Sequence, residues 1–262
     1  MTIELEKYYG KFCEDKRLTR RHGQVEYITT MKYIHQYLNG MQRASILDVG
    51  AGTGRYAIPL SEEGHDVTAI ELVKYNLGTL LSKKSNVKAM QGNALDLSRF
   101  EENTFDMTLV FGPMYHLFAF NDKVKVLEEA KRVTKVGGVI LVAYCMNEFS
   151  VITHGFKENK IRECMEQGKL TKDFHTVCEP KDLYDYVRIE DITKLVETAQ
   201  LERIQLIAAD GPANYLRPIL NAMDEETFDL FIQYHLSTCE RADLLGASAH
   251  TLDILRKGPI IS

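Results

Sequence analysis

An apolar segment that runs directly into a glycine-rich loop constrains the fold of this chain most strongly. Ser45–Val49 is a short apolar run, and Gly50-Ala51-Gly52-Thr53-Gly54 follows it at once. A strand buried on both faces lacks the polar alternation of a half-exposed strand. Glycines permit a tight turn into a helix and let a ligand approach the backbone closely. We therefore expect a buried strand, a ligand-binding turn and a helix over residues 55–63.

Strand-like and helix-like segments alternate after this loop. Four further apolar runs are predicted as strands, at residues 66–71, 87–90, 105–111 and 139–144. Helical periodicity separates them, and Asp122 is placed to cap the helix before the last of these strands. Five strands in such an alternation predict a parallel sheet with right-handed crossovers.

The rest of the chain predicts two closing strands and a helical cap. Residues 201–208 and 250–256 have the pattern of strands. The helical segments have no place within the sheet, and we expect them to cover the carboxyl ends of its strands, where open α/β sheets bind ligands. They are residues 1–40, 147–180 and 211–247. We expect one domain over residues 1–262, with its binding core at about residues 44–146.

Composition excludes several classes of protein. With 45% hydrophobic and 26% charged residues among 262, the chain is neither disordered nor fibrous. Residues 139–146, the longest apolar stretch, are too short to span a bilayer, and the N-terminus has no signal-peptide pattern. A net charge of −5 argues against a nucleic-acid partner. The five cysteines form no Cys-x-x-Cys pair, which predicts a cytoplasmic protein.

The spacing around the glycine loop indicates a nucleoside ligand. The dinucleotide pattern Gly-x-Gly-x-x-Gly requires glycine at position 55, where this chain has Arg55, and no Gly-Lys-Ser/Thr of a P-loop follows. Glu71 ends the second predicted strand, 71 − 52 = 19 residues after Gly52. An acid about 20 residues after the central glycine binds ribose hydroxyls. The ligand therefore carries a ribose but lacks the usual pyrophosphate contact.

These segments resemble motif I and its followers in the class I S-adenosylmethionine-dependent methyltransferases, most closely the small-molecule members of the methyltransferase type 11 kind. Motif I corresponds to residues 46–54, and supporting segments follow at 69–72, 91–94, 105–110 and 136–140. The resemblance implies a doubly wound, Rossmann-like α/β sheet of seven strands. In that sheet the strands are mostly parallel, with the last antiparallel, and a helical cap is added.

The same resemblance implies methyl transfer from S-adenosyl-L-methionine to an O, N or S atom of a small-molecule acceptor. The reaction is an in-line displacement that releases S-adenosyl-L-homocysteine and uses no metal. Neither nucleic acid nor membrane is implied as a partner. Three alternatives stay open: a methyltransferase acting on RNA or protein, an NAD-dependent oxidoreductase, which Arg55 disfavours, and a non-catalytic protein that binds S-adenosylmethionine.

The resemblance assigns the cofactor contacts residue by residue. The loop residues Gly50, Ala51, Gly52 and Gly54 are expected against the methionine half and the ribose, with Asp48 positioning the amino group. The alternative for Asp48 is that it simply caps the turn.

The resemblance assigns the contacts to the ribose and the adenine to residues at the ends of the second and third strands. Glu71 is expected to accept the ribose hydroxyls, and Leu72 to pack on the adenine. Asn93, where the family often has Asp, is expected to accept from the adenine amino group, or alternatively only to stabilise a turn. Ala94 is expected to offer its backbone N–H to the ring, and Phe111 to contact the cofactor near the methyl group.

The loop after the fourth strand is expected to face the acceptor. It lacks the Asn/Asp-Pro-Pro-Tyr/Phe sequence of enzymes that methylate exocyclic amines of bases or glutamine amides. A hydroxyl or ammonium acceptor must lose a proton, and His116 is the candidate base. A hydrogen-bonded structural histidine is the alternative. Tyr115 is expected either to orient the substrate or to pack.

Three outlying residues are further candidates for substrate contact. Arg21, in the basic run at residues 16–22, can pair with a carboxylate or lie on a solvated helix face. Tyr215 and Arg217 are candidates within the cap. The segment at residues 246–250 suggests a nucleophile elbow but lacks its final glycine. The eight histidines form no His-x-His or His-x-x-x-His pair, so the sequence predicts no metal site.

Overall fold

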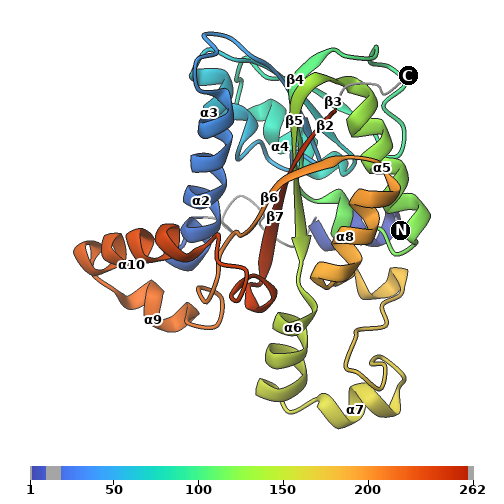
Figure 1. Cartoon of the computed structure of the whole chain (residues 1–262), viewed down its shortest axis with the longest axis vertical. Helices are drawn as coiled ribbons and strands as arrows, with labels where there is room; N and C mark the ends of the chain where they lie inside the picture. Colours follow the sequence, from blue (N-terminus) through green and yellow to red (C-terminus); the bar gives the residue numbers. More distant parts are fainter. Residues whose placement is uncertain (1, 10–18, 259–262) are drawn as a thin grey trace.

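A mixed sheet forms the centre of the computed structural model, which describes residues 2–9 and 19–258 (Figure 1). The strand order is β3-β2-β1-β4-β5-β7-β6. The strands are β1 (Ser45–Val49), β2 (Asp66–Glu71), β3 (Lys88–Gln91), β4 (Phe105–Val110), β5 (Thr134–Cys145), β6 (Glu202–Ala208) and β7 (His250–Arg256). Only β7 pairs antiparallel with its neighbours, β5 and β6. The predicted seven-stranded, mostly parallel sheet with an antiparallel last strand is confirmed.

Successive residues of the central strands enter different hydrophobic clusters on the two faces of the sheet. In β5, Ile140 and Val142 pack with α5 (Phe120–Val133) and α8 (Ile189–Thr198). Val139 and Leu141 pack on the other side, with α2 (Arg21–Leu38), α3 (Ala57–Glu62) and Leu80 of α4 (Lys74–Ser82). Both faces are therefore covered, which is why these strands show no polar alternation in the sequence.

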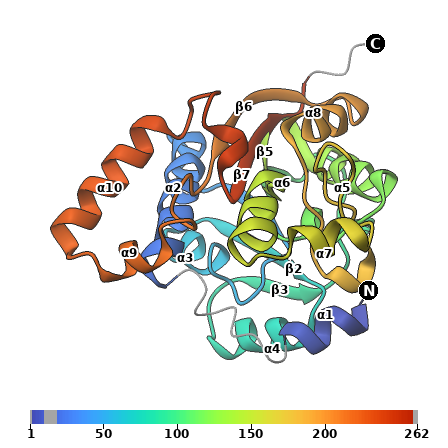
Figure 2. The same ribbon diagram turned by 90° about the horizontal axis from the view of Figure 1, so that it is seen from below.

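The remaining helical segments lie outside the two covering layers. They are α1 (Thr2–Tyr9), α6 (Asn147–Ser150), α7 (Ile161–Glu166), α9 (Arg217–Ala222), α10 (Glu225–Thr238) and the short turns η2 (Pro113–Tyr115), η3 (Val151–Lys157), η4 (Pro180–Asp182) and η5 (Leu245–Ala247). Helices α6 and α7 extend beyond the end of β5, and α9 and α10 lie beside α2 (Figures 1 and 2).

Two local expectations from the sequence are corrected. Helix α2 lies within the predicted cap range 1–40, yet Tyr33 and Ile34 are fully buried in the cluster that covers one face of the sheet. Asp122 does not cap α5: the helix begins at Phe120 after the N-cap Ala119, and Asp122 lies in the first turn. Its own backbone N–H donates to the carbonyl of Ala119, so Asp122 lies inside the helix and not at the position before it that a capping residue takes.

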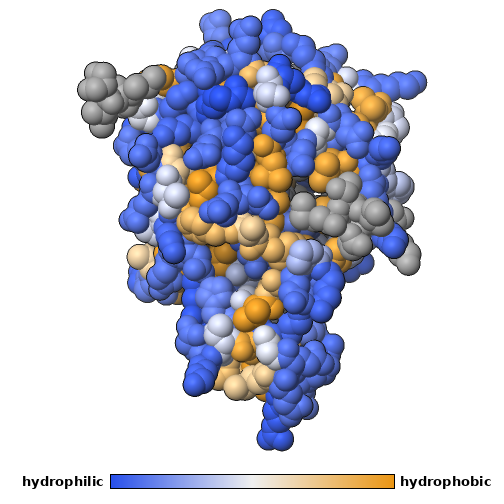
Figure 3. Space-filling view, turned by 90° about the vertical axis from the view of Figure 1, so that its right-hand side faces the viewer, coloured by the Kyte–Doolittle hydropathy of each residue, from blue (hydrophilic) through white to orange (hydrophobic). Residues whose placement is uncertain are grey.

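The surface is mainly hydrophilic, with apolar residues exposed on the projecting segment that contains η3 and α7. Figure 3 shows apolar side chains on this segment and in the band where it joins the body. Those of the segment and the loop after it that are at least 39% exposed are Ile152, Phe156, Met165, Phe174 and Val177. None of the helices in the described ranges combines the length and apolar character needed to cross a membrane.

A buried ion pair joins the two closing strands. The carboxylate of Asp253 on β7 is fully buried and accepts from Nε and Nη2 of Arg203 on β6 at 2.8 and 2.9 Å. Burial raises the pKa of Asp253, and the guanidinium acts against that rise. Removing one partner of such a pair leaves a buried charge without compensation.

We expect Arg203→Met to destabilise the fold by about 3 kcal/mol at pH 7, because Asp253 is then buried without its cation. Urea unfolding followed by circular dichroism measures the change. Arg241→Met is the matched control, because Arg241 forms an exposed pair with Asp243 and its loss leaves the unfolding midpoint unchanged. Equal midpoints for the two variants would show that the buried pair contributes no more to the free energy of unfolding than the exposed pair does.

Candidate functional site

A cavity opens at the carboxyl edge of the sheet, where β1, β2 and β4 end. Its lining runs from Gly92, Asn93 and Ala94 beyond β3 to His250 and Thr251 on β7. Because β7 is antiparallel, its first residue meets the same edge: His250 pairs with Cys145, the last residue of β5. The cavity therefore spans most of the width of the sheet.

The glycine loop after β1 forms part of the cavity wall. Gly50, Gly52 and Gly54 have φ values of 83°, 55° and 86°, a backbone region that other residues rarely adopt. A Cβ on Gly50 would lie 2.7 Å from Cδ of Pro113, in the loop after β4. Gly50, Ala51 and Gly52 line the cavity. Gly54 is absent from the lining and packs tightly on Leu80 of α4, so it shapes the turn.

Asp48 places a buried carboxylate in the cavity wall. The residue is 1% exposed, and neither of its carboxylate oxygens has a hydrogen-bond partner among the described residues. Burial, with a smaller contribution from the nearby charge of Glu71, raises its pKa to about 7. A buried carboxylate without a partner is costly to ionise. A cationic ligand group beside it would remove that cost.

Glu71 joins the glycine loop to the segment after β2. Its two carboxylate oxygens accept from the backbone N–H groups of Gly52 and Val73, both at 2.7 Å. A carboxylate has about four acceptor positions, so two backbone bonds do not by themselves exhaust it. Leu72 also lines the cavity.

The third cofactor segment forms a turn at the cavity wall. Asn93 and Ala94 both line the cavity, and the side-chain oxygen of Asn93 accepts from the N–H of Leu95 at 3.1 Å. The turn-stabilising alternative for Asn93 is therefore present in the structure. Phe111 lines the cavity from the end of β4.

Both ring nitrogens of His116 are hydrogen-bonded. Nδ1 donates to the carbonyl of Leu183 at 2.8 Å, and Nε2 lies 2.9 Å from the hydroxyl of Tyr9, from which it accepts in this tautomer. Burial lowers the pKa of His116. The rings of Tyr115 and Tyr184 pack beside it, with centroids at 4.9 and 5.2 Å. His116 and Tyr115 line the cavity, but this arrangement favours the structural alternative for His116 over a base.

The three outlying candidates, Arg21, Tyr215 and Arg217, do not line the cavity, and their expected contact with the substrate stays a prediction. The guanidinium of Arg21 donates to the carbonyl of Met223 and lies over the ring of Phe228. Arg217 donates to Asn214 at 2.7 Å. The contacts of Arg21 join α2 to the α9–α10 segment, whereas the bond of Arg217 is local.

The ring of Tyr215 lies 5.1 Å from that of Phe149 at the start of the projecting segment. Tyr215 therefore packs between two outer segments. Residues 16–18 of the basic run lie outside the described residues.

Sequence reasoning missed three charged residues of the cavity wall: Glu26 on α2, Arg55 after the glycine loop, and His250. The guanidinium of Arg55 lies 4.1 Å from the ring centroid of Tyr27. For His250 a signal existed, because an antiparallel last strand must begin at the edge where parallel strands end. Glu26 and Arg55 had no comparable signal.

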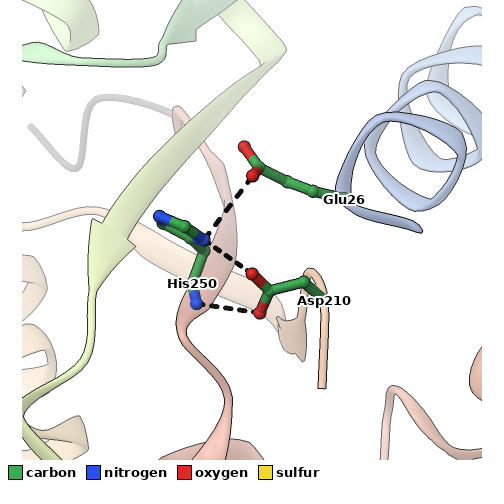
Figure 4. A group of neighbouring side chains, drawn as sticks. All are labelled: Glu26, Asp210 and His250. Atoms are coloured by element: carbon green, nitrogen blue, oxygen red, sulfur yellow. Dashed lines mark hydrogen bonds and ion pairs between the residues drawn. The ribbon is translucent and has the colours of Figure 1, made fainter. Parts of the chain in front are cut away.

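Glu26, Asp210 and His250 gather at the β7 end of the cavity, with ligand atoms within 4.8 Å of one another (Figure 4). The sequence predicts no metal site, since these residues are far apart along the chain. Among the described residues, this group has the residue types and spacing that a cation requires. The hydrogen bonds of Asp210 and His250 distinguish a cation site from a histidine held in one orientation.

Comparison with known proteins finds similarity to methyltransferases. Residues 47–142 match a family model described as a methyltransferase domain. A curated relative, demethylmenaquinone methyltransferase of Renibacterium salmoninarum, is 38% identical over 114 residues, which are 42% of this chain and 43% of the relative. The chain thus spans less than half the length of that relative.

Solved structures extend the likeness of the fold. A SAM-dependent methyltransferase from Methanosarcina mazei superposes with a TM-score of 0.59 at 14% identity, over 86% of this chain and 97% of the other. Geranyl diphosphate C-methyltransferase from Streptomyces coelicolor, solved with Mg²⁺, geranyl diphosphate and S-adenosyl-L-homocysteine, gives 0.55 at 12% identity, over 88% and 79%. Residues 47–142 of the chain are thus similar in sequence to a methyltransferase domain, and the chain shares the fold of solved S-adenosylmethionine-dependent methyltransferases.

Proposed function

We propose that the protein transfers the methyl group of S-adenosyl-L-methionine to an O, N or S atom of a small molecule and releases S-adenosyl-L-homocysteine. The observation that carries this proposal is the carboxylate of Asp48. It is buried, faces a cavity at the carboxyl edge of the sheet, and has no partner among the described residues. The ammonium group of the methionine half matches it in charge.

The other residues of this half of the cavity also fit the cofactor. The positive φ values of the glycine loop keep side chains away from the methionine half and the ribose. Glu71 lies beside Gly52 at the end of β2, where an acid binds ribose hydroxyls. Leu72, Asn93 and Ala94 supply the surface for the adenine. We assign the cofactor to the half of the cavity over β1, β2 and β3.

When bound, the cofactor supplies an electrophilic methyl group on a sulfonium. The residues of the chain then have three tasks: to hold the cofactor, to align the acceptor atom with the S–CH₃ bond, and to exclude water. Alignment of this kind accounts for much of the rate enhancement of such transfers. Phe111 and Tyr115 line the cavity beyond β4 and are placed to orient the acceptor.

The similar proteins and the net charge favour a small molecule as the methyl acceptor. The curated relative is named for demethylmenaquinone, and the structure from Streptomyces coelicolor holds geranyl diphosphate. The net charge of −5 gives no general attraction for RNA. The rival functions are methylation of RNA or protein and binding of the cofactor without turnover.

Labelling distinguishes these functions. Calorimetry first measures binding of S-adenosyl-L-homocysteine to the full chain. The protein is then incubated with methyl-labelled S-adenosylmethionine and a size-fractionated cell extract. We expect label in metabolites of low mass that survives nuclease and protease treatment. Label in RNA or protein would favour that rival. Binding without transfer would leave a non-catalytic protein, and no binding would defeat the proposal.

Asp48 makes cofactor affinity depend on pH. Ionised Asp48 attracts an ammonium, so binding lowers its pKa from about 7 and releases a proton below that pH. Affinity therefore rises with pH, by about tenfold between pH 6 and 8, and then levels off. Calorimetry with S-adenosyl-L-homocysteine measures this dependence. Asp48→Asn weakens binding at pH 8 by at least about tenfold and removes the dependence.

Asp66→Asn is the control for that variant. Asp66 pairs with Lys88 at the exposed amino end of the sheet, far from the carboxyl edge, so its affinity curve should follow that of the unaltered protein. A curve for Asp48→Asn that keeps the full pH dependence would separate Asp48 from the cofactor.

The glycine loop tolerates no side chain at position 50. We expect Gly50→Ala to weaken binding of S-adenosyl-L-homocysteine more than about tenfold, because the new Cβ forces the loop and Pro113 apart. Gly64→Ala is the matched control: its φ of 99° is equally unfavourable to alanine, but a Cβ there has nothing within 4 Å. It should retain affinity within about twofold. Similar affinities for both variants would show that backbone strain, and not the contact with Pro113, decides binding.

A further inference from the structure

His250 stands at the end of the cavity opposite the proposed cofactor half. Under the proposed function, β1, β2 and β3 carry the cofactor, and the acceptor occupies the end over β4, β5 and β7. Residues from three separate parts of the chain line that end: Thr30 on α2, Ala143 on β5, and His250 with its neighbour Thr251 on β7. His250 is thus placed on the acceptor side.

Asp210 holds the imidazole of His250 in one orientation. Oδ2 of Asp210 lies 2.6 Å from Nδ1 of His250 and also accepts from the amide of Asn214 at 2.7 Å. Oδ1 accepts from the Ser248 hydroxyl and from the backbone N–H groups of Ala249 and His250, at 2.6 to 3.0 Å. Five donors therefore fix a carboxylate that is fully buried.

The other ring nitrogen of His250 is available to a ligand. Nδ1 must donate to Asp210, so in the neutral ring the lone pair lies on Nε2. Figure 4 shows the opposite edge of the ring turned away from both Asp210 and Glu26. Within residues 2–9 and 19–258, Nε2 has no hydrogen-bond partner. His116 differs, because both of its nitrogens are bonded within the protein.

We propose that His250 is the general base for the methyl acceptor and that Asp210 is its positioning residue. This inference rests on the proposed function. As the acceptor atom forms its bond to the methyl carbon, the C–S bond breaks and its electron pair stays on sulfur. The proton of the acceptor atom passes to Nε2 of His250, and the electron pair of that bond stays on the acceptor. Asp210 and Glu26 stabilise the imidazolium, which later releases its proton to water.

The acceptor is therefore a group that must lose a proton, a hydroxyl or a protonated amine. A thioether or a tertiary amine needs no base. An acceptor whose own anionic group sits next to His250 is disfavoured, because Glu26 lines the cavity there, with Oε2 3.5 Å from Nδ1. The carboxylate of Glu26 favours a neutral or cationic molecule at this end.

The charges around His250 determine its pH dependence. Glu26 of α2, Asp210 of the loop after β6, and Cys145 of β5 all raise its pKa, and burial opposes them. The net effect is a pKa well above the ordinary value. A base must be unprotonated to act, so methyl transfer rises as pH increases through this pKa and then levels off.

A cation at this cluster is the competing explanation. Metal ligation by Nδ1 requires that atom to lose the hydrogen bond to Asp210, and Asp210 already accepts from five donors. The geometry thus suits an oriented histidine better than an empty ligand set. Direct titration with Mg²⁺ and Zn²⁺ decides the matter.

The first test needs no acceptor. Histidine labelled with ¹³C at Cε1 is titrated by NMR in the full chain, with His250→Gln to assign the signal. We expect His250 to titrate above the ordinary range and Glu26→Gln to lower its pKa. A signal at or below that range and insensitive to Glu26→Gln would overturn the proposal. Micromolar binding of Mg²⁺ or Zn²⁺ alone that shifts this signal would also overturn it, in favour of a metal site.

The second test is kinetic. Its acceptor is a fresh portion of the small-metabolite fraction in which label was found. His250→Gln should lower the rate at pH 7.5 by at least about 100-fold, with affinity for S-adenosyl-L-homocysteine unchanged within about twofold. Its residual rate should rise with pH without levelling off, because the acceptor must then ionise by itself. His154→Gln is the matched control, since His154 is exposed on η3 and pairs only with Glu158 among the described residues.

The outcomes separate this inference from the proposed function. Asp210→Asn should move the NMR titration of His250 downward, and it should lower the rate and move the pH dependence of methyl transfer downward by the same amount; a purely structural role would leave the pH dependence of transfer in place. If His250→Gln transfers methyl groups as fast as His154→Gln, the base assignment fails and the proposed function stands. Failure of cofactor binding in the unaltered protein defeats the proposed function, while the NMR result still tests the dyad.

Discussion

A buried carboxylate without a protein partner is the constraint on which the rest of the site depends. Asp48 lies on β1, an inner strand between β2 and β4 of a sheet covered on both faces, and it is 1% exposed, so water does not solvate it. Its pKa is raised because the ionised carboxylate is unfavourable in that buried position. Under the proposed function, the ammonium group of the cofactor takes the place beside it. The glycine loop, Glu71 and the turn at Asn93 are arranged around that place.

The two histidines of the cavity differ in their hydrogen bonding. His116 lies in the loop after β4, and its nitrogens are bonded to Leu183 and Tyr9. These bonds join α1 and the segment just after η4 to the cavity wall. His250 lines the cavity and has one ring nitrogen held by Asp210, while the other has no hydrogen-bond partner among the described residues. Opposite environments also shift their pKa values in opposite directions.

The outer segments have more varied tasks than a simple cap. Helix α2 buries Tyr33 and Ile34 against the sheet and presents Glu26 to the cavity. Arg21, at the start of the same helix, binds the α9–α10 segment. A long charged side chain at a helix end can bind a ligand or contact a neighbouring segment, and the surrounding sequence is the same in both cases. Only the packing of the neighbouring helices decides.

The sequence alone determined the order of the strands' appearance, the glycine turn and the acid at Glu71. These depend on local patterns: apolar runs, backbone freedom and a fixed spacing within one βαβ unit. The meeting of Glu26, Asp210 and His250 was decided by tertiary structure. It needs a helix from the amino end, the loop after β6 and the antiparallel β7 to converge on one edge. No local pattern records such a convergence, because it depends on strand order and on long-range packing.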